Sequence, residues 1–394
     1  MRRLNRALDS QQRLRASAAI FSAVERLPEF RAARTVAVFA ALPDEPATDE
    51  VLARVVASCG GKELDNRMLD FYYWQQYYTL MNNYGSYASY FIDTSTPFDQ
   101  QMCMFDDTRT WQQYFLQAAI TNYENVTAIW QEARLAGFQL SQEDQDYLDE
   151  LDGQITVAAA SYSYGSADEY LQMAYGPAAT LTSYHAFVER QITASAYLQA
   201  LVDEKPYTED DISKYYDDNA DSYAGNGIEK SDVKMVNVRH ILIQPEGKND
   251  DGTYTDEAWA EAEKKANDLL TEWQNGEHTE DSFAFMAAEN SQDPGSVENG
   301  GLYEDIYPGK MVDEFDAWCF DPARQPGDTG IVKTSYGYHI MYFSSTGEHA
   351  YWYVRAEEDY LNELSVSVLQ EVAAKFEVTE SEQNAAIVDI MQQN

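Results

Sequence analysis

The chain has 394 residues, a length typical of two or three domains. Hydrophobic residues make up 44% of it and aromatic residues 13%, which is enough for packed cores and argues against wholesale disorder. The formal net charge is −40 at pH 7, and so acidic a protein repels nucleic acid, so we expect no nucleic-acid partner.

Cysteine and histidine patterns indicate neither a disulfide framework nor a metal site. Cys59, Cys103 and Cys319 are unevenly spaced and form no CxxC pair. The five histidines show no HExxH or related ligand spacing. We therefore expect no metal and no cofactor. No run of 18 apolar residues is present, so no membrane-spanning helix is predicted either.

The composition changes abruptly near residue 60. Residues 1–60 hold nine arginines, no lysine and seven acidic residues, a net charge of +2. Residues 61–394 hold 18 basic and 60 acidic residues, a net charge of −42, and they contain all 29 tyrosines and all seven tryptophans. We therefore predict an N-terminal fragment, 1–58, unrelated to the rest of the chain.

The predicted elements of this fragment are a helix over 3–24, a buried strand over 35–41 and a helix after Asp49. The stretch LPEFRAARTVAVFAALPDEPATDEVL resembles the N-terminus of 5-formyltetrahydrofolate cyclo-ligases over residues 1–57. The resemblance implies that Arg3 or Arg6 would bind ATP phosphates and that Glu45 would contact the folate. The glycine-rich nucleotide loop of that family is absent, so a ligase remnant, left by a gene fusion or a misassigned start, is expected rather than an active ligase.

Residues 56–60, VASCG, have the small-residue form of a bacterial lipoprotein cleavage box, in which Cys59 would carry the lipid. The preceding DEVLAR is too charged for the apolar region of a signal peptide, so coincidence is the favoured interpretation. A membrane anchor at Cys59 remains the alternative. No intact export signal is predicted.

Residues 64–223 have helical periodicity, with helices predicted over 111–136, 141–160, 181–202 and 210–223. The aromatic run FYYWQQYY, residues 71–78, is explained either by core packing or by a groove that binds extended chains. The segments GKELDNRMLDFYYWQQYY and EDDISKYYDDNADSY resemble the helical chaperone domain of SurA- and PrsA-type proteins. We predict such a domain over 60–228, completed by C-terminal helices within 353–394.

A compact antiparallel α+β domain is predicted over 233–347. It opens with an alternating strand, 233–243, continues with helices over 256–275 and about 281–290, and ends with the strands GIVKT and YHIMYF. His240 and His339 occupy equivalent places on the first and last strands. They are either ordinary core histidines or, with an Asp in the intervening loop, a polar cluster beneath a pocket.

The ordered motifs VRHILI, NSQD, NGGLY, GKMVDEFDAWCF and GDTGIVKTSYGYHIMYF resemble those of parvulin-type peptidyl-prolyl cis–trans isomerases. The resemblance implies a hydrogen-bonded pair, His240 and His339, with Asp293 beside it. It also implies an apolar proline pocket formed by Leu302, Met311 and Phe315, with Phe320 at its border. The implied polar rim consists of Thr334 and Tyr336. One departure is visible, because the family's usual GG-D-L-G reads GGLY at 300–303.

The sequence thus predicts a multi-domain α+β protein in which a PrsA/SurA-like helical chaperone domain carries a parvulin domain. We expect a peptidyl-prolyl isomerase and foldase for unfolded exported proteins, located outside the cytoplasm. The loop QPEGKNDDGTYTDE holds one lysine among several acids, so substrates without phosphate are expected. The alternatives are a non-catalytic holdase with a binding-only parvulin domain and, third, the ligase remnant.

Overall fold

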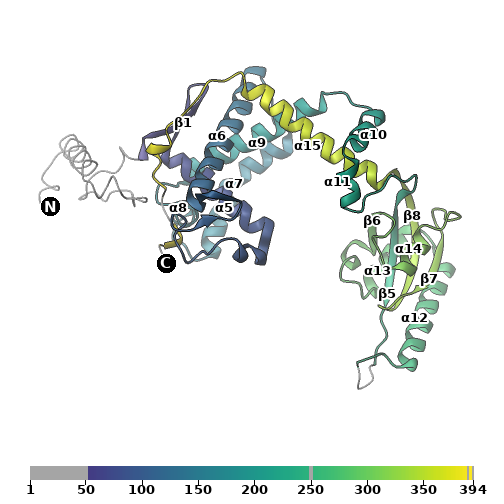
Figure 1. Ribbon diagram of the computed structural model, residues 1–394. Coiled ribbons are helices and arrows are strands. Elements are labelled where there is room, and N and C mark those ends of the chain that lie inside the picture. The colour runs from purple at the N-terminus through teal and green to yellow at the C-terminus, as the bar shows by residue number, and fades with distance from the viewer. Residues whose placement is uncertain (1–51, 248–251, 388–389, 393–394) are drawn as a thin grey trace, which may run out of the picture. The chain divides into compact units, whose positions relative to one another are not determined.

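The computed structural model describes residues 52–247, 252–387 and 390–392. The predicted helix over 3–24, the strand over 35–41 and nearly all of the cyclo-ligase-like stretch lie outside the described residues. The chain divides into two compact units, Met1–Pro206 with Glu363–Asn394, and Tyr207–Asn362. Both contain helices and antiparallel sheet, so the protein is a multi-domain α+β protein, as predicted (Figure 1).

The first unit consists mainly of helices (Figure 1): α5 Asn66–Tyr84, α6 Trp111–Ala136, α7 Gln142–Ser161, α8 Ala167–Tyr175 and α9 Leu181–Asp203. The predicted helix over 111–136 is confirmed to the residue. A capping box at Thr110 begins it, and Gly137 ends it in the left-handed conformation.

Aromatic side chains form the core of the first unit. Phe71, Tyr72, Tyr73 and Trp74 are each at most 1% exposed. Phe71 stacks on Phe187 of α9 with ring centroids 5.4 Å apart. For these four residues of the FYYWQQYY run, the core-packing interpretation is confirmed.

Two small sheets complete the first unit. One has the order β2-β1-β9, with β1 Val55–Cys59, β2 Lys62–Asp65 and β9 Val378–Glu380. The other is the hairpin of β3 Met102–Cys103 and β4 Asp106–Thr110, which follows the 3₁₀ helix η1 Gly85–Tyr90. Of the C-terminal helices predicted within 353–394, one long helix forms, and after it the described residues instead form β9, which pairs with β1, and the 3₁₀ turns η3 Glu382–Asn384 and η4 Ile390–Gln392.

Strand β1 crosses the end of the predicted N-terminal fragment, 1–58. It begins at Val55, inside the predicted N-terminal fragment, and pairs Ala57 with Glu380 from the C-terminal end of the chain. Cys59 is fully buried in this strand, and burial raises the pKa of its thiol to about 11. The structure therefore gives the lipid-anchor alternative no support.

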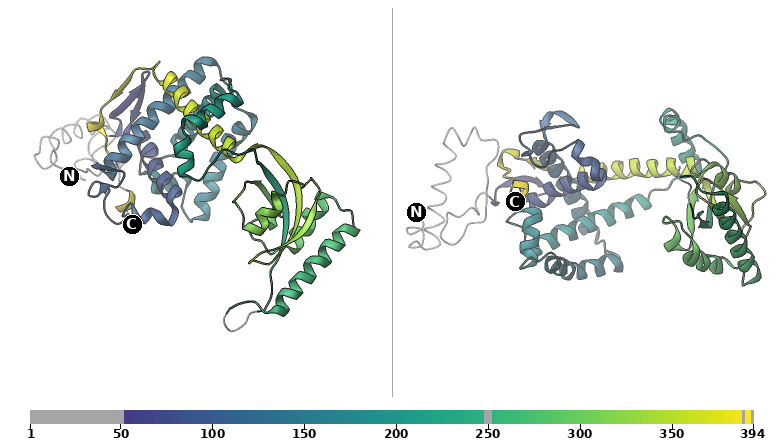
Figure 2. Two further views of the ribbon diagram at one scale, coloured as in Figure 1. Left: turned by 45° about the vertical axis from the view of Figure 1, so that its right-hand side comes forward. Right: turned by 90° about the horizontal axis from the view of Figure 1, so that it is seen from below.

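The second unit contains α10 Glu209–Asp218, α11 Ala220–Gly225 and a four-stranded antiparallel sheet in the order β6-β5-β8-β7. The strands are β5 Lys234–Ile243, β6 Leu302–Ile306, β7 Thr329–Lys333 and β8 Tyr338–Ala350. Helices α12 Asp256–Asn275 and α13 Glu280–Asn290 pack on one face, and α14 Asp313–Cys319 on the other. The left view of Figure 2 shows α12 running alongside this sheet.

Helix α15, Tyr351–Ala373, contributes to both units. Its first turns pack Tyr353 and Ala356 against Tyr216 and Tyr223 in the second unit. In its last turn, Val372 belongs to a buried apolar cluster of the first unit. Segments 207–228 and 353–362 therefore group with the second unit, whereas the sequence prediction assigned them to the helical domain.

Candidate active site

His240 and His339 lie on the same face of the sheet, on its central strands β5 and β8. The register pairs His240 with Met341 and Leu242 with His339, so the two imidazoles are diagonal neighbours. Their Nδ1 atoms are 3.1 Å apart, and the rings stack with centroids separated by 5.2 Å. Both side chains are buried. The structure thus brings the two predicted histidines into direct contact.

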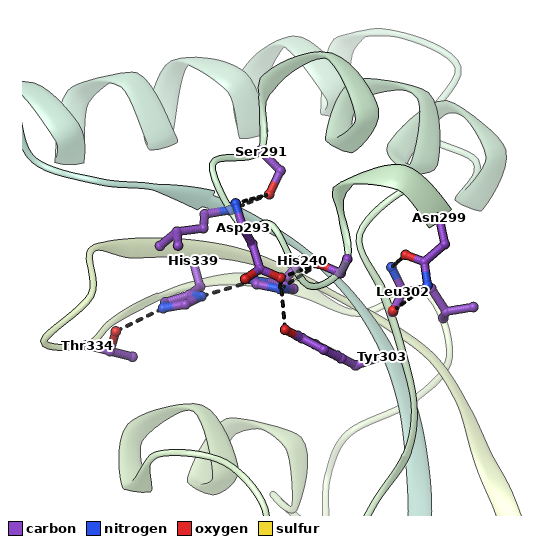
Figure 3. A network of polar contacts seen from close by, with 10 residues as sticks. His240, Ser291, Asp293, Asn299, Leu302, Tyr303, Thr334 and His339 are labelled. Carbon is purple, nitrogen blue, oxygen red and sulfur yellow. Dashed lines mark hydrogen bonds and ion pairs between the residues drawn. The ribbon is translucent and has the colours of Figure 1, made fainter. Parts of the chain in front are cut away.

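Asp293 reaches this pair from the segment that follows α13. The backbone N–H of Leu242 donates to Ser291 Oγ, and the N–H of Gln292 donates to the Leu242 carbonyl, so β5 holds the segment at two points. Asp293 Oδ2 consequently lies 3.1 Å from His240 Nε2 (Figure 3).

Thr334 closes the other end of the network. Its Oγ1 lies 2.9 Å from His339 Nε2, and its side chain is buried. The backbone N–H of Tyr336 donates to the same oxygen at 3.1 Å. The Tyr336 ring itself is 57% exposed, so of the two predicted rim residues only Thr334 contributes its side chain to the network.

Apolar side chains pack against the histidine pair from α14 and the chain around it. The Phe315 ring meets both imidazoles edge to face, with centroids 5.4 Å from each. Met311 and Phe320 are partly buried against the same cluster. Of the four predicted pocket residues, Phe315 therefore contacts both histidines, and Met311 and Phe320 pack on the apolar cluster that contains Phe315.

The fourth, Leu302, lies on the other face of the sheet. Strand β6 pairs Leu302 with Arg239 and Tyr303 with Val238. Because successive strand residues point to opposite faces, Leu302 shares the α13 side with Arg239, and Tyr303 shares the side of the histidines. Figure 3 shows Leu302 away from the histidine pair. Leu302 is thus not on the side of the sheet where the prediction expected it, and Tyr303 is the strand residue that lies on the histidine side.

Two members of the network were missed from sequence. Ser296, which is 1% exposed, has Oγ 2.5 Å from Asp293 Oδ2 and 3.1 Å from His240 Nε2. Tyr303 donates its hydroxyl to Asp293 Oδ2 at 2.9 Å and stacks its ring on His240, with centroids 5.1 Å apart. The departure from the family pattern at 300–303 was a signal for Tyr303. Ser296 had none.

Gly301 lets the loop before β6 pass close to β5. It adopts φ +75°, and a Cβ at this position would lie 2.3 Å from the His240 carbonyl oxygen. The Gly301 carbonyl in turn accepts the His240 N–H at 2.8 Å. Only glycine fits here, and it fixes the backbone that carries His240.

Two members of the network, Asp293 and His339, have strongly lowered pKa values. The hydrogen bond from His240, with those from Ser296 and Tyr303, lowers the pKa of Asp293 far below its usual range despite burial, so this carboxylate only accepts. Burial and the neighbouring His240 lower the pKa of His339 to about 4, which leaves it neutral at pH 7.

The donor and acceptor roles of the ring nitrogens depend on their tautomers. Because the Asp293 carboxylate only accepts, His240 Nε2 is the donor of the contact with Asp293 Oδ2. The two Nδ1 atoms share one hydrogen bond, and His339 Nε2 and the Thr334 hydroxyl share the next. A continuous chain of hydrogen bonds thus runs from Thr334 through both imidazoles to Asp293.

Other features of the described residues lie apart from this network. Within 52–247, 252–387 and 390–392, no three His, Cys, Asp or Glu side chains form a group that could hold a metal ion. In the part of the chain that the structure describes, no helix is long and apolar enough to cross a bilayer. A cavity of about 580 Å³ in the second unit is lined from α10, α11 and α15, and its lining includes none of the histidine-network residues.

Residues 226–345 match the family described as the PPIC-type PPIASE domain. The chain therefore contains a domain of the parvulin-type peptidyl-prolyl isomerase family, in agreement with the motifs and with the geometry above.

The proteins to which the chain is similar include foldases and a chaperone. It is 31% identical to foldase protein PrsA 1 of Listeria innocua over 106 residues, 27% of this chain and 29% of the relative. It is 30% identical to foldase protein PrsA of Geobacillus kaustophilus over 144 residues, 36% and 38% of the two chains. It is 35% identical to chaperone SurA of Pseudomonas savastanoi pv. phaseolicola over 107 residues, 27% and 22%. The match thus spans well under half the length of each relative.

Proposed function

We propose that the chain is a peptidyl-prolyl cis–trans isomerase and foldase that acts on unfolded, non-phosphorylated exported polypeptides. The observation that carries this proposal is the hydrogen-bonded histidine pair, held between Asp293 and Thr334 and packed against Phe315. The matched family and the foldase and chaperone names of the relatives support it.

The chemistry of Xaa-Pro isomerisation suits these residues. The barrier of about 18–20 kcal/mol arises from amide resonance, so no nucleophile is required. Met311, Phe315 and Phe320 would hold the prolyl ring while the preceding carbonyl rotates. A desolvated slot disfavours the polar planar amide relative to the twisted one. Asp293 would act either by destabilising the planar carbonyl or by holding the histidine tautomers.

The substrate class follows from charge. Phosphoserine recognition relies on clustered arginine or lysine side chains. The nearby Lys310 donates to the carbonyl oxygens of Glu304 and Asp305, and Arg239 pairs with Glu280. With the acidic loop after β5, this arrangement favours Xaa-Pro bonds without phosphate. The exported location of the clients is inferred from the resemblance to PrsA- and SurA-type proteins.

A second candidate function is that of a holdase chaperone, and one observation in the first unit favours it. The segment from Tyr84 to Phe105 exposes several large apolar side chains, each at least 39% accessible: Tyr84, Tyr87, Tyr90, Met102, Met104 and Phe105. Exposed apolar groups gathered in a short segment typify surfaces that bind other chains. Such a surface would retain unfolded clients with or without isomerase activity.

Isomer exchange on an unphosphorylated Xaa-Pro peptide, followed by NMR, tests the proposal. We expect the full chain to accelerate exchange, and we expect a variant with Asp293→Ala and Met311→Ala to lose at least tenfold. A folded protein that does not accelerate exchange, yet suppresses aggregation of an unfolded client, would leave the holdase function in its place.

A further inference from the structure

One oxygen atom of the network receives an unusual number of hydrogen bonds. Asp293 Oδ2 is contacted by His240 Nε2 at 3.1 Å, Ser296 Oγ at 2.5 Å and Tyr303 Oη at 2.9 Å. The three donors come from different segments: strand β5, the turn before η2 Val297–Asn299, and strand β6. Three donors that converge on one oxygen favour the carboxylate form, which only accepts hydrogen bonds.

Tyr303 makes two contacts with this end of the network. Its ring stacks on His240 with an interplanar angle of 18°, and its hydroxyl donates to Asp293. Burial, together with that hydrogen bond, raises the pKa of Tyr303 to about 12, so the phenol keeps its proton. One side chain thus fixes both the acceptor and the donor of the His240–Asp293 hydrogen bond.

We propose that Tyr303 is a positioning residue of the isomerase site, which with Ser296 holds Asp293 as a carboxylate facing His240. This inference rests on the proposed isomerase function. Of the two roles considered for Asp293, destabilising the planar carbonyl or holding the histidine tautomers, it favours the second. An oxygen that already accepts from three donors serves to orient the histidines. The carbonyl of a substrate is then influenced through the histidines rather than by Asp293 directly.

The titratable groups around Asp293 permit this role. His240 faces it from β5, Tyr303 faces it from β6, and His339 on β8 acts on it through His240. On α14, which packs on the same face, the acid Asp316 instead accepts the Gly309 N–H, and Cys319 is buried with its thiol pKa raised to about 12 by burial. The residues described here thus place donors around Oδ2 and no second carboxylate.

The test is a carboxyl titration in the full-length protein. With ¹³C-labelled aspartate, the Asp293 signal is identified by its loss in Asp293→Asn. We expect the wild-type carboxyl to remain ionised at pH 3. In the double variant Ser296→Ala with Tyr303→Phe, which retains the ring but removes two of three donors, its midpoint should rise by at least one pH unit and lie above pH 3.

The variants Tyr303→Phe and Tyr342→Phe form a matched pair for activity. Tyr342 lies on the opposite face of the same sheet, packed against Trp273 and Phe283. We expect Tyr303→Phe to lower kcat/KM for isomer exchange three- to tenfold and to weaken the NMR signature of the His240 Nε2–H tautomer. Tyr342→Phe should leave both unchanged.

An Asp293 titration that is identical in the wild type and the double variant would overturn the inference. The carboxyl titration and the tautomer signals do not depend on turnover. If the wild-type protein had no isomerase activity, the proposed function would be wrong. The carboxyl titration and the tautomer signals would still decide whether Tyr303 positions Asp293.

Discussion

Tyrosine serves as a packing residue in the first unit, whereas in the second unit a tyrosine hydroxyl completes a polar network. Tyr72 is fully buried and meets Tyr123 and Phe187 edge to face. The pKa of Tyr72 is raised to about 12, mainly by burial. Tyr303 reaches a similar pKa, but with a carboxylate as its hydrogen-bond acceptor.

Because one unit relies on packed rings and the other on a hydrogen-bond network, the two should be sensitive to different kinds of substitution. A core of interlocking rings depends on volume and shape, so its losses appear as unfolding free energy. A chain of directed hydrogen bonds depends on single protons, so its losses should appear in activity and in pH dependence. Substitutions in the two units should therefore differ in whether they change unfolding free energy or activity.

The largest effect is expected for Phe71→Ala in the first unit. Phe71 is fully buried and contacts Tyr175, Tyr184 and Phe187. We expect the unfolding free energy of that unit, measured by urea denaturation, to fall by about 3–5 kcal/mol. The exposed Tyr87→Ala is the control and should change it by less than about 0.5 kcal/mol. A loss below about 1 kcal/mol for Phe71→Ala would contradict the tight core.

In the second unit, Gly301→Ala should destabilise more than Gly309→Ala. Both glycines have positive φ, +75° and +87°, but a Cβ at Gly301 meets the His240 carbonyl whereas none lies within 4 Å at Gly309. The shared backbone strain costs about 1 kcal/mol. The clash should add at least about 1 kcal/mol more and should also lower isomer exchange. Equal losses in the two variants would show that the close approach at Gly301 is unimportant.

Stability should fall on acidification because of His339. Its folded pKa, about 4, lies below its ordinary value of 6.5, so between these values the unfolded state binds a proton that the folded state does not. The unfolding free energy therefore decreases by about 1.4 kcal/mol per unit as pH falls through this window. Asp293, whose pKa is also lowered in the folded state, adds a loss of the same sign at still lower pH.

Urea denaturation of His339→Gln between pH 4.5 and 7.5 measures this contribution. The variant should lose the histidine part of the slope, while the exposed His278→Gln should keep it. A slope unchanged in His339→Gln would mean that His339 takes up its proton as readily in the folded protein as in the unfolded chain.

The smallest effect on the fold is expected for Tyr87→Ser with Tyr90→Ser in the exposed Tyr84–Phe105 segment. These rings stack on each other and are 67% and 75% exposed, so stability should change little. Suppression of client aggregation should weaken several-fold. The matched control, Leu135→Ser with Tyr162→Ser, removes two equally exposed apolar side chains elsewhere in the unit. Equal weakening in both pairs would argue against a specific surface.

Periodicity predicted the long helices and the strands β5 and β8, because these depend on local pattern, and the resemblance to the parvulin motifs implied the contact of His240 with His339. They did not predict β1 and β9, since the pairing of Ala57 with Glu380 joins the two ends of the described chain. Position 302 was misplaced because strand alternation makes a one-residue offset reverse the face. The role of Ser296 could not be predicted, because it depends on the contact between the turn before η2 and strand β5 in the folded chain.

The most direct test is isomer exchange of an unphosphorylated Xaa-Pro peptide, measured with two variants of the full chain. One combines Asp293→Ala and Met311→Ala, and the other combines Tyr87→Ser and Tyr90→Ser. We expect the first to lose at least tenfold in exchange rate and the second to retain the wild-type rate. Exchange that persists in the first variant, or that disappears in the second, would contradict an isomerase centred on the histidine network.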